Sequence, residues 1–308
     1  MASDFENRLK ERVLLLDGSM GVMLRKHGAT NPAMLSLSRP DLVAGVHDAY
    51  LAAGADIIET NSFTANALSQ RMHGSDGQVA EMNRAAARIA VASARTRMKL
   101  DPSRPRFVGG SMGPAVDPAS STESLRRDCV RDLDFRRNIY AEQARALIEG
   151  GVDLLMIETM MDAADAGCAL AGAREAMHLA GKTVPVTVSA TISATTGKLL
   201  SGHSPEEFLA AVAPYGPAAV GFNCSEGPAS LAEAARDLAK GSPFPLILYP
   251  NAGLPDGDGN YELGPEEFVA ELAPLIGDKL LGIVGIVGGC CGTGPAHTAA
   301  LRHHLDNL

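Results

Sequence analysis

The sequence predicts a single-domain α/β protein, a (β/α)₈ TIM barrel that spans residues 1–308. Short apolar runs alternate with alanine-rich stretches of helical pattern along the whole chain. Each run is continuously apolar, which is typical of strands buried on both faces of a parallel sheet. Eight such runs in 308 residues give about 38 residues per βα unit, the usual size in such barrels. A doubly wound sheet is the alternative, but its Gly-x-Gly-x-x-Gly fingerprint is missing from Asp17-Gly18-Ser19-Met20-Gly21.

The predicted elements follow one another in a regular order. The eight predicted strands are Val13–Leu16, Asp56–Glu59, Arg106–Gly109, Leu154–Glu158, Val184–Ala190, Ala219–Asn223, Leu246–Tyr249 and Gly282–Val287. Helix starts are clearest where a proline precedes two acids, at Ser204-Pro205-Glu206-Glu207 and Gly264-Pro265-Glu266-Glu267. Proline suits the first helical position, and acids there complement the helix dipole. No linker rich in Pro, Gly or Ser divides the chain, which favours one domain.

Composition excludes several classes of function. The net charge of −9, from 27 basic and 36 acidic residues, provides no basic patch for nucleic acid. The apolar runs are shorter than the roughly 18 residues that suggest a membrane span, and the polar segment 1–12 is unlike a secretory signal. Five cysteines, an odd number, fit a reducing compartment better than a disulfide framework. We therefore expect a cytoplasmic protein with no nucleic-acid or membrane partner.

Three cysteines form the clearest candidate site. Cys290 and Cys291 lie within Gly288-Gly289-Cys290-Cys291-Gly292-Thr293, and Cys224 follows Gly221-Phe222-Asn223. Adjacent side chains on a strand point to opposite faces, but flanking glycines permit the bend that would aim both at one point. Three thiolates converging on Zn²⁺ leave a fourth tetrahedral position open, as in catalytic zinc sites.

Other interpretations of the cysteines remain open. A disulfide between Cys290 and Cys291 would be strained, and buried cysteines are often inert small hydrophobes. Cys129, in a charged stretch, and Cys168, in an alanine-rich run, are predicted to be ordinary helix residues.

Polar residues gather where the predicted strands end, which is where barrels of this type place their active sites. In chain order they are Asp17, then Glu59, Thr60 and Asn61, then Ser111, then Glu158 and Thr159, then Ser189 and Thr191, then Asn223 and Cys224, then Asn251, and finally Cys290 and Cys291. The sixth and eighth strands supply all three candidate ligands, with one strand between them. That separation is short enough to bridge in a closed barrel.

Two of these carboxylates suggest a cationic substrate group. Asp17 and Glu158 would be costly to bury without a partner, and a substrate ammonium would supply one. Alternatively, they cap helices or bind Arg or Lys. Glu59 has a weaker claim, because it could simply hold backbone. The backbone of Gly18 and Ser19 could bind a substrate carboxylate, although a plain tight turn explains these residues nearly as well.

Several motifs together resemble the homocysteine S-methyltransferase family, over essentially the whole chain. They are Leu15-Leu16-Asp17-Gly18-Ser19-Met20-Gly21, Ala53-Gly54-Ala55-Asp56-Ile57-Ile58-Glu59-Thr60-Asn61-Ser62-Phe63, Gly221-Phe222-Asn223-Cys224 and Gly288-Gly289-Cys290-Cys291-Gly292-Thr293. Within the family, Pro250-Asn251-Ala252-Gly253-Leu254-Pro255 and Ser201-Gly202-His203 most resemble the homocysteine-binding domain of cobalamin-dependent methionine synthases.

The resemblance implies that residues 1–308 form a zinc-dependent, homocysteine-binding barrel domain. It would activate homocysteine as a zinc thiolate and transfer a methyl group to its sulfur, forming methionine. By the same resemblance, the metal ligands of one Zn²⁺ per chain would be Cys224, Cys290 and Cys291. The homocysteine ammonium would be held by Asp17 and Glu158, and its carboxylate would lie near the backbone of Gly18 and Ser19. Asn223 would either be an oxygen ligand in the empty enzyme or orient Cys224.

The methyl donor is the open part of this expectation. The chain has no Asp-x-His-x-x-Gly cobalamin signature, so we expect methylcobalamin or another methylcorrinoid to be carried by a separate protein. Direct transfer from S-methylmethionine or betaine is the alternative, against which the absence of Trp counts because onium groups favour aromatic cages. A non-catalytic zinc or homocysteine-binding protein is an alternative of another class. His203 either faces the donor or is a solvated loop residue.

Overall fold

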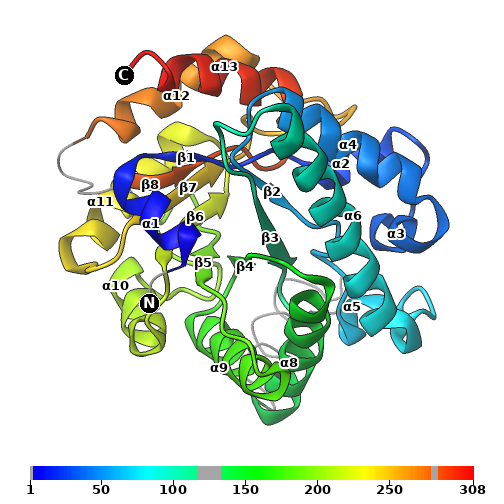
Figure 1. Cartoon of the computed structure of the whole chain (residues 1–308). Coiled ribbons are helices and arrows are strands. Elements are labelled where there is room, and N and C mark those ends of the chain that lie inside the picture. Colours follow the sequence, from blue (N-terminus) through cyan, green and yellow to red (C-terminus); the bar gives the residue numbers. More distant parts are fainter. Residues whose placement is uncertain (1–2, 117–132, 279–283) are drawn as a thin grey trace.

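A computed structural model describes residues 3–116, 133–278 and 284–308, and Cys129 lies outside them. Eight parallel strands surround a central axis, with helices around the outside (Figure 1). The strands are β1 (Leu14–Leu15), β2 (Ile57–Glu59), β3 (Phe107–Met112), β4 (Leu154–Met160), β5 (Val186–Ala190), β6 (Ala219–Cys224), β7 (Leu246–Pro250) and β8 (Val284–Val287).

The sheet closes on itself between its first and second strands. The hydrogen-bonded order runs β1-β8-β7-β6-β5-β4-β3-β2, with every pair parallel. Leu16 bridges Ile57, and the backbone N–H of Asp17 donates to the Ile57 carbonyl at 3.0 Å. The predicted single-domain (β/α)₈ barrel is therefore confirmed.

Most strand boundaries agree with the prediction to within two residues; β6 and β7 end one residue later than predicted, and β3 and β4 run further. β3 continues past the predicted end at Gly109 to Met112. β4 continues past Glu158 to Met160, and its register with β5 shifts between Ile157 and Met160. The polar residues at these ends therefore belong to the strands themselves, which fixes them more firmly than a loop would.

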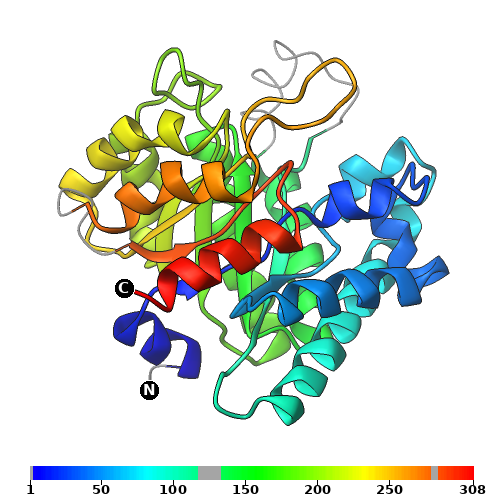
Figure 2. The same ribbon diagram turned by 90° about the horizontal axis from the view of Figure 1, so that it is seen from above.

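Helices follow the strands on the outside of the barrel. They are α1 (Asp4–Glu11), α2 (Met20–Arg25), α3 (Leu35–Ser38), α4 (Pro40–Ala52), α5 (Ala67–Arg71), α6 (Val79–Leu100), α8 (Leu133–Gly150), α9 (Ala163–Ala180), α10 (Pro205–Val212), α11 (Pro228–Gly241), α12 (Pro265–Ile276) and α13 (Pro295–Leu305). The predicted proline starts of α10 and α12 are confirmed, and Ser204 forms a capping box with Glu207. The turned view shows the last helix, α13, beside the strand layer (Figure 2). None of the helices in the described parts has the length and apolarity needed to cross a bilayer.

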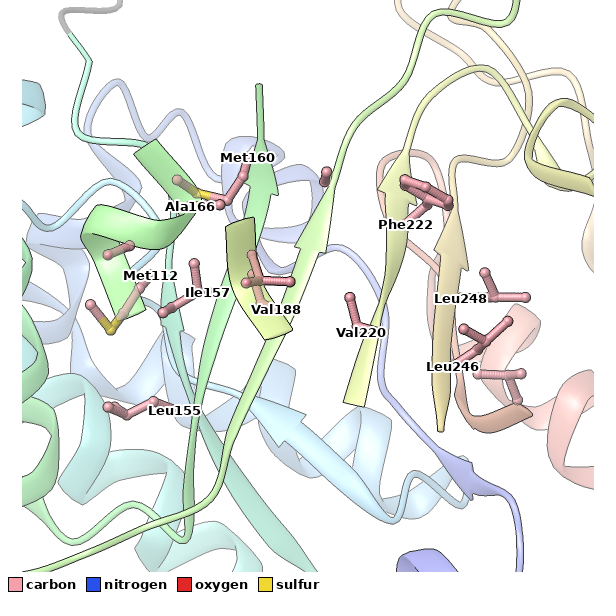
Figure 3. Packing of buried hydrophobic residues seen from close by; sticks show 14 of the residues in the cluster. Met112, Leu155, Ile157, Met160, Ala166, Val188, Val220, Phe222, Leu246 and Leu248 are labelled. Carbon is pink, nitrogen blue, oxygen red and sulfur yellow. The ribbon is translucent and has the colours of Figure 1, made fainter. Parts of the chain in front are cut away.

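Side-chain alternation along the strands separates two cores. Outward-facing residues such as Leu155, Ile157, Val188 and Leu248 pack under the helices (Figure 3). Inward-facing residues form a second, smaller cluster inside the barrel, including Leu14, Leu16, Ile57, Phe107, Leu154, Met156, Ala219, Ile247 and Ile286.

A layer of polar side chains lies above this inner apolar floor. Residues two positions apart on a strand share a face, so Glu59 follows Ile57 and Glu158 follows Met156 on the inside of the barrel. The other inward polar residues reached by the same step are Ser111, Ser189, Asn223 and Tyr249. The carboxyl end of the barrel is therefore lined by groups that can bind a polar ligand.

Candidate active site

Three thiols converge above the polar layer. Cys224 ends β6, whereas Cys290 and Cys291 follow β8, and β7 lies between. Their Sγ atoms all lie within 4.8 Å of one another, and those of Cys224 and Cys290 are 2.8 Å apart. Tetrahedral Zn–S bonds of about 2.3 Å place sulfurs about 3.8 Å apart. The two closest sulfurs would have to move about 1 Å further apart for the trio to bind such an ion.

The described cysteines are free, so the alternative of a disulfide between the adjacent cysteines is not what the structure shows. Cys168 lies in α9, as predicted, and its Sγ donates to the Leu133 carbonyl at 3.0 Å. It is not part of the cluster formed by the other three described thiols.

The backbone around the trio is bent in a different way from the prediction. Of the nearby glycines, Gly292 alone has a left-handed conformation, with φ of +84°. Gly288 and Gly289 are needed for close approach instead. An added Cβ would lie 2.6 Å from the Leu16 Cβ or 2.5 Å from Thr293, respectively. The strongest bend is at the other cysteine, because Cys224 and Ser225 have φ of 55° and 61°, which non-glycine residues rarely adopt.

Asn251, at the end of β7, ties the two cysteine-bearing turns together. Its amide nitrogen donates to the Ser225 carbonyl at 2.5 Å, and its amide oxygen accepts from the Cys291 N–H at 3.0 Å. The Cys290 N–H donates to the Pro250 carbonyl at 2.7 Å. The end of β7, which carries no cysteine, thus positions the two cysteine-bearing turns after β6 and β8.

Asn223 is held by a hydrogen-bond network that occupies both lone pairs of its amide oxygen. That oxygen accepts from the Thr159 N–H and the Ser189 hydroxyl, both at 2.8 Å. The amide nitrogen donates to the Thr159 hydroxyl at 2.6 Å, and Tyr249 contacts the Ser189 hydroxyl at 2.6 Å. An amide oxygen has two lone pairs. These contacts favour the interpretation in which Asn223 orients Cys224 over the one in which it binds metal.

The same contacts stabilise an unusual backbone at Thr159, whose φ is 57°. A β-branched residue in the left-handed region is strained by on the order of 1–3 kcal/mol. The reciprocal pair of hydrogen bonds with Asn223 offsets that strain. It also connects the residue after Glu158 directly to the residue before Cys224.

The three sulfurs share negative charge unequally. Hydrogen bonds from the Cys224 and Cys290 thiols lower the pKa of Cys291 to about 3. Hydrogen bonds to Cys224 and Cys291, together with burial, raise the pKa of Cys290. The cluster therefore prefers one thiolate stabilised by two thiols, and a cation at this position would favour ionisation of all three.

Three carboxyl groups lie together beside the thiols. Asp17 is 1 % exposed and Glu158 4 % exposed, and Glu59, from the intervening β2, lies with them. Burial raises the pKa of all three, that of Glu158 to about 7, and repulsion from Glu158 raises those of Asp17 and Glu59 further. The Ser111 hydroxyl donates to the Glu158 carboxyl group and lowers its pKa in part.

The turn after β1 packs against the cysteine loop. A Cβ on Gly18 would lie 2.6 Å from the Thr293 hydroxyl and 3.0 Å from the Tyr50 hydroxyl. The Ser19 hydroxyl caps α2 by accepting from the Val22 N–H at 3.2 Å. In the described parts of the chain, no hydrogen-bond acceptor engages the backbone N–H groups of Gly18 and Ser19. These two N–H groups are thus free to bind an anion, as the sequence prediction requires.

The structure brings the predicted residues to one end of the barrel and adds others. Glu59 joins Asp17 and Glu158, although its predicted role was the weaker one. Tyr249 was missed because it belongs to an apolar strand run. The Nδ1 of His203 contacts Ser201 at 2.8 Å and Asp162 at 3.3 Å, and its side chain is 38 % exposed.

A model of the homocysteine S-methyltransferase family matches residues 14–305. The chain belongs to the homocysteine S-methyltransferase family. The resemblance in the motifs is thereby confirmed, and so is the expected class of enzyme, a homocysteine S-methyltransferase. All residues of the thiol and carboxyl clusters lie within the matched range.

Solved structures of this family share the fold. They include the homocysteine methyltransferase MmuM from Escherichia coli in a metallated form, with 24 % identity, a TM-score of 0.77, and coverage of 96 % of this chain and 97 % of that one. An oxidised form of the same enzyme has 24 % identity and a TM-score of 0.79, with coverage of 98 % of this chain and 100 % of that one. An apo form has 25 % identity and a TM-score of 0.68, with coverage of 96 % of each chain. The barrel of this homocysteine S-methyltransferase is therefore similar to that of MmuM over nearly the full length of both chains.

Proposed function

We propose that this enzyme binds one Zn²⁺ through Cys224, Cys290 and Cys291 and methylates homocysteine at the fourth metal position. The observation that carries the proposal is the convergence of three Sγ atoms within 4.8 Å. Cysteine sulfur is a preferred zinc ligand, and three protein ligands with an open position are typical of catalytic zinc.

The zinc would supply the deprotonation of the substrate thiol. A free thiol with a pKa of about 8.5 is only about 3 % thiolate at pH 7, so full ionisation is worth about 2 kcal/mol. The residues of the chain would supply binding and orientation. Asp17 and Glu158 would hold the ammonium, and the free N–H groups of Gly18 and Ser19 would receive the carboxylate. With both ends fixed, the sulfur is directed to the cysteine trio, and positioning lowers the barrier to in-line transfer.

Asn223 would position the site rather than react. Its contacts with Thr159 connect the ammonium-binding strand β4 to the metal-binding strand β6. Residues that orient metal ligands typically contribute a factor of 10–100 to metal affinity. The distance between the ammonium subsite and the metal would therefore be set by this pair of hydrogen bonds.

The zinc assignment is tested by metal analysis of matched variants. Cys224→Ala should lose the bound zinc and methyl transfer, because two sulfurs cannot complete the site. Cys168→Ala is the control, since it removes a thiol that donates to the Leu133 carbonyl and is not one of the clustered cysteines. A full equivalent of zinc and normal turnover in Cys224→Ala would refute the ligand assignment. X-ray absorption separates catalysis from passive binding: homocysteine should raise the sulfur ligands from three to four, whereas an unchanged shell favours the non-catalytic class.

For the donor we propose a methylcorrinoid carried by a separate protein. The support is the resemblance of the segments 250–255 and 201–203 to cobalamin-dependent methionine synthases. Zinc-loaded enzyme should form methionine when given homocysteine and methylcobalamin. S-Methylmethionine and betaine, tested in turn, are the competing donors, and methionine formed only from one of them would overturn this order.

A further inference from the structure

Glu59 is the carboxyl group that the proposed function leaves without a role. It lies on the inner face of β2, and the register pairs it with Gly109 of β3. Gly109 has no side chain, and an added Cβ would lie 2.4 Å from the Met156 Sδ and 3.7 Å from the Ile57 Cγ2. Side chains of β2 and β4 therefore meet across β3. Glu59 and Glu158 lie on the same faces, each two residues after the side chain (Ile57 or Met156) that meets Gly109.

Contacts join these two carboxyl groups to the third. The Glu59 N–H donates to Asp17 Oδ2 at 3.0 Å, which fixes the β1 carboxylate beside β2. A hydrogen bond between the Glu59 and Glu158 carboxyl groups lowers the pKa of Glu158 and raises that of Glu59, so Glu59 is the partner that carries the proton. Carboxyl groups in this position share one proton because both cannot ionise at low cost.

Among the residues that the structure describes, no cation acts on the carboxyl cluster. The charged groups that act on its three members are all acidic: the other two carboxyl groups and Cys291. Tyr50 of α4 and Tyr249 of β7 also face it, and the same carboxylates raise their pKa values in addition to burial. Asp17 Oδ1 and Glu59 Oε1 are shielded from solvent without any hydrogen-bond partner in the described structure. Buried acceptors of this kind are costly unless a donor reaches them.

We infer that Glu59 is a third ligand of the substrate ammonium group, and that binding this ammonium expels a proton held between Glu59 and Glu158. The inference rests on the proposed function. In the step, the O–H bond of the shared proton breaks, the proton passes to solvent, and the –NH₃⁺ group takes its place. Three N–H donors then meet carboxylates from β1, β2 and β4.

The experiment uses L-methionine, which has the ammonium but no thiol, so zinc-linked proton release does not interfere. Isothermal titration at pH 6.5 in buffers of different ionisation enthalpy counts protons released on binding. The zinc-loaded enzyme should release close to one proton per methionine. Glu59→Gln should release almost none, because its amide mimics the protonated carboxyl group but cannot ionise. Its Kd for methionine should rise about 10- to 100-fold, the effect of one charge-assisted hydrogen bond.

Two controls keep the outcomes distinct. Glu271→Gln, on the exposed face of α12, should behave as the unaltered enzyme. 4-(Methylthio)butanoate, which is methionine without its ammonium, should bind the unaltered enzyme without proton release, and this comparison holds even if Glu59→Gln fails to fold. Equal proton release by the unaltered enzyme and Glu59→Gln, or by the two ligands, would overturn the inference. Absence of any binding of methionine and homocysteine would instead overturn the proposed function.

Discussion

The buried histidine of α4 should make this enzyme lose stability in mild acid. His47 is fully buried on the same helical stripe as Val43, Tyr50 and Leu51, and neither ring nitrogen has a hydrogen-bond partner in the described structure. Burial lowers its pKa from 6.5 to about 3. Between these values the unfolded chain binds a proton that the folded chain does not. Stability is therefore full above pH 6.5 and falls as the pH drops toward 3.

The magnitude follows from the two pKa values. From pH 7.5 to pH 5.0, linkage predicts a loss of about 2 kcal/mol from His47 alone. For a chain of 308 residues, with an unfolding entropy of about 2 cal/mol/K per residue, this is about 3 °C in Tm. In His47→Leu the loss should disappear. The carboxyl cluster titrates equally in both proteins, so it cancels when their pH dependences are subtracted.

The assay is urea unfolding at pH 7.5 and 5.0 for the unaltered enzyme, His47→Leu and the control His303→Leu, which changes an exposed histidine of α13. The control should match the unaltered enzyme to within about 0.5 kcal/mol at both pH values. If the difference between His47→Leu and the unaltered enzyme stays constant with pH, the histidine has a partner or a water and the reasoning is wrong.

Three further perturbations test the site. Gly18→Ala should raise the KM for homocysteine, because the added Cβ would lie 2.6 Å from the Thr293 hydroxyl. The control Gly45→Ala has open space around the added Cβ, so it should leave the free energy of unfolding unchanged or raise it by up to about 1 kcal/mol. Asn223→Ala should destabilise the fold by about 2–4 kcal/mol, as measured by urea unfolding. It should also weaken zinc binding about 10- to 100-fold, as measured by competition with a chelator. Unchanged zinc affinity would contradict a positioning role through Thr159. Chelation should abolish transfer and leave the far-ultraviolet circular dichroism intact, since the core consists of aliphatic and aromatic side chains and Cys290 is the one member of the trio that packs against it. Loss of the spectrum would show that zinc is structural.

Much of the fold was predictable because each strand is buried on both faces. Continuous apolar runs located all eight strands, and the interval between them indicated the barrel. The thiol trio was also predictable, because barrel topology places the ends of β6 and β8 one strand apart. The boundaries of β3 and β4 were less certain, since polar residues at Ser111 and Glu158 interrupt the apolar pattern while the backbone continues as strand.

The rest of the site depends on contacts between residues far apart in sequence. Thr159 and Asn223 are 64 positions apart, so the local sequence does not predict the left-handed backbone at Thr159. It also does not predict that the Asn223 amide oxygen already accepts two hydrogen bonds. Glu59 gains importance from Gly109 of β3, whose missing side chain lets side chains of β2 and β4 meet across β3. The glycines before Cys290 illustrate a different limit. Their presence indicated a special backbone, but only the structure shows that they permit close packing against Leu16 and Thr293 rather than an unusual φ.

The placement of the cysteines on either side of β7 has a consequence for how the enzyme matures. Cys224 and Cys290 are 66 positions apart in the chain and meet only when β7 has docked between their strands. An unfolded chain would have to close a long loop to present the same three sulfurs, which disfavours early capture of the ion. Zinc uptake during refolding should therefore report completion of the last quarter of the barrel, making the metal a late marker of assembly rather than a template for it.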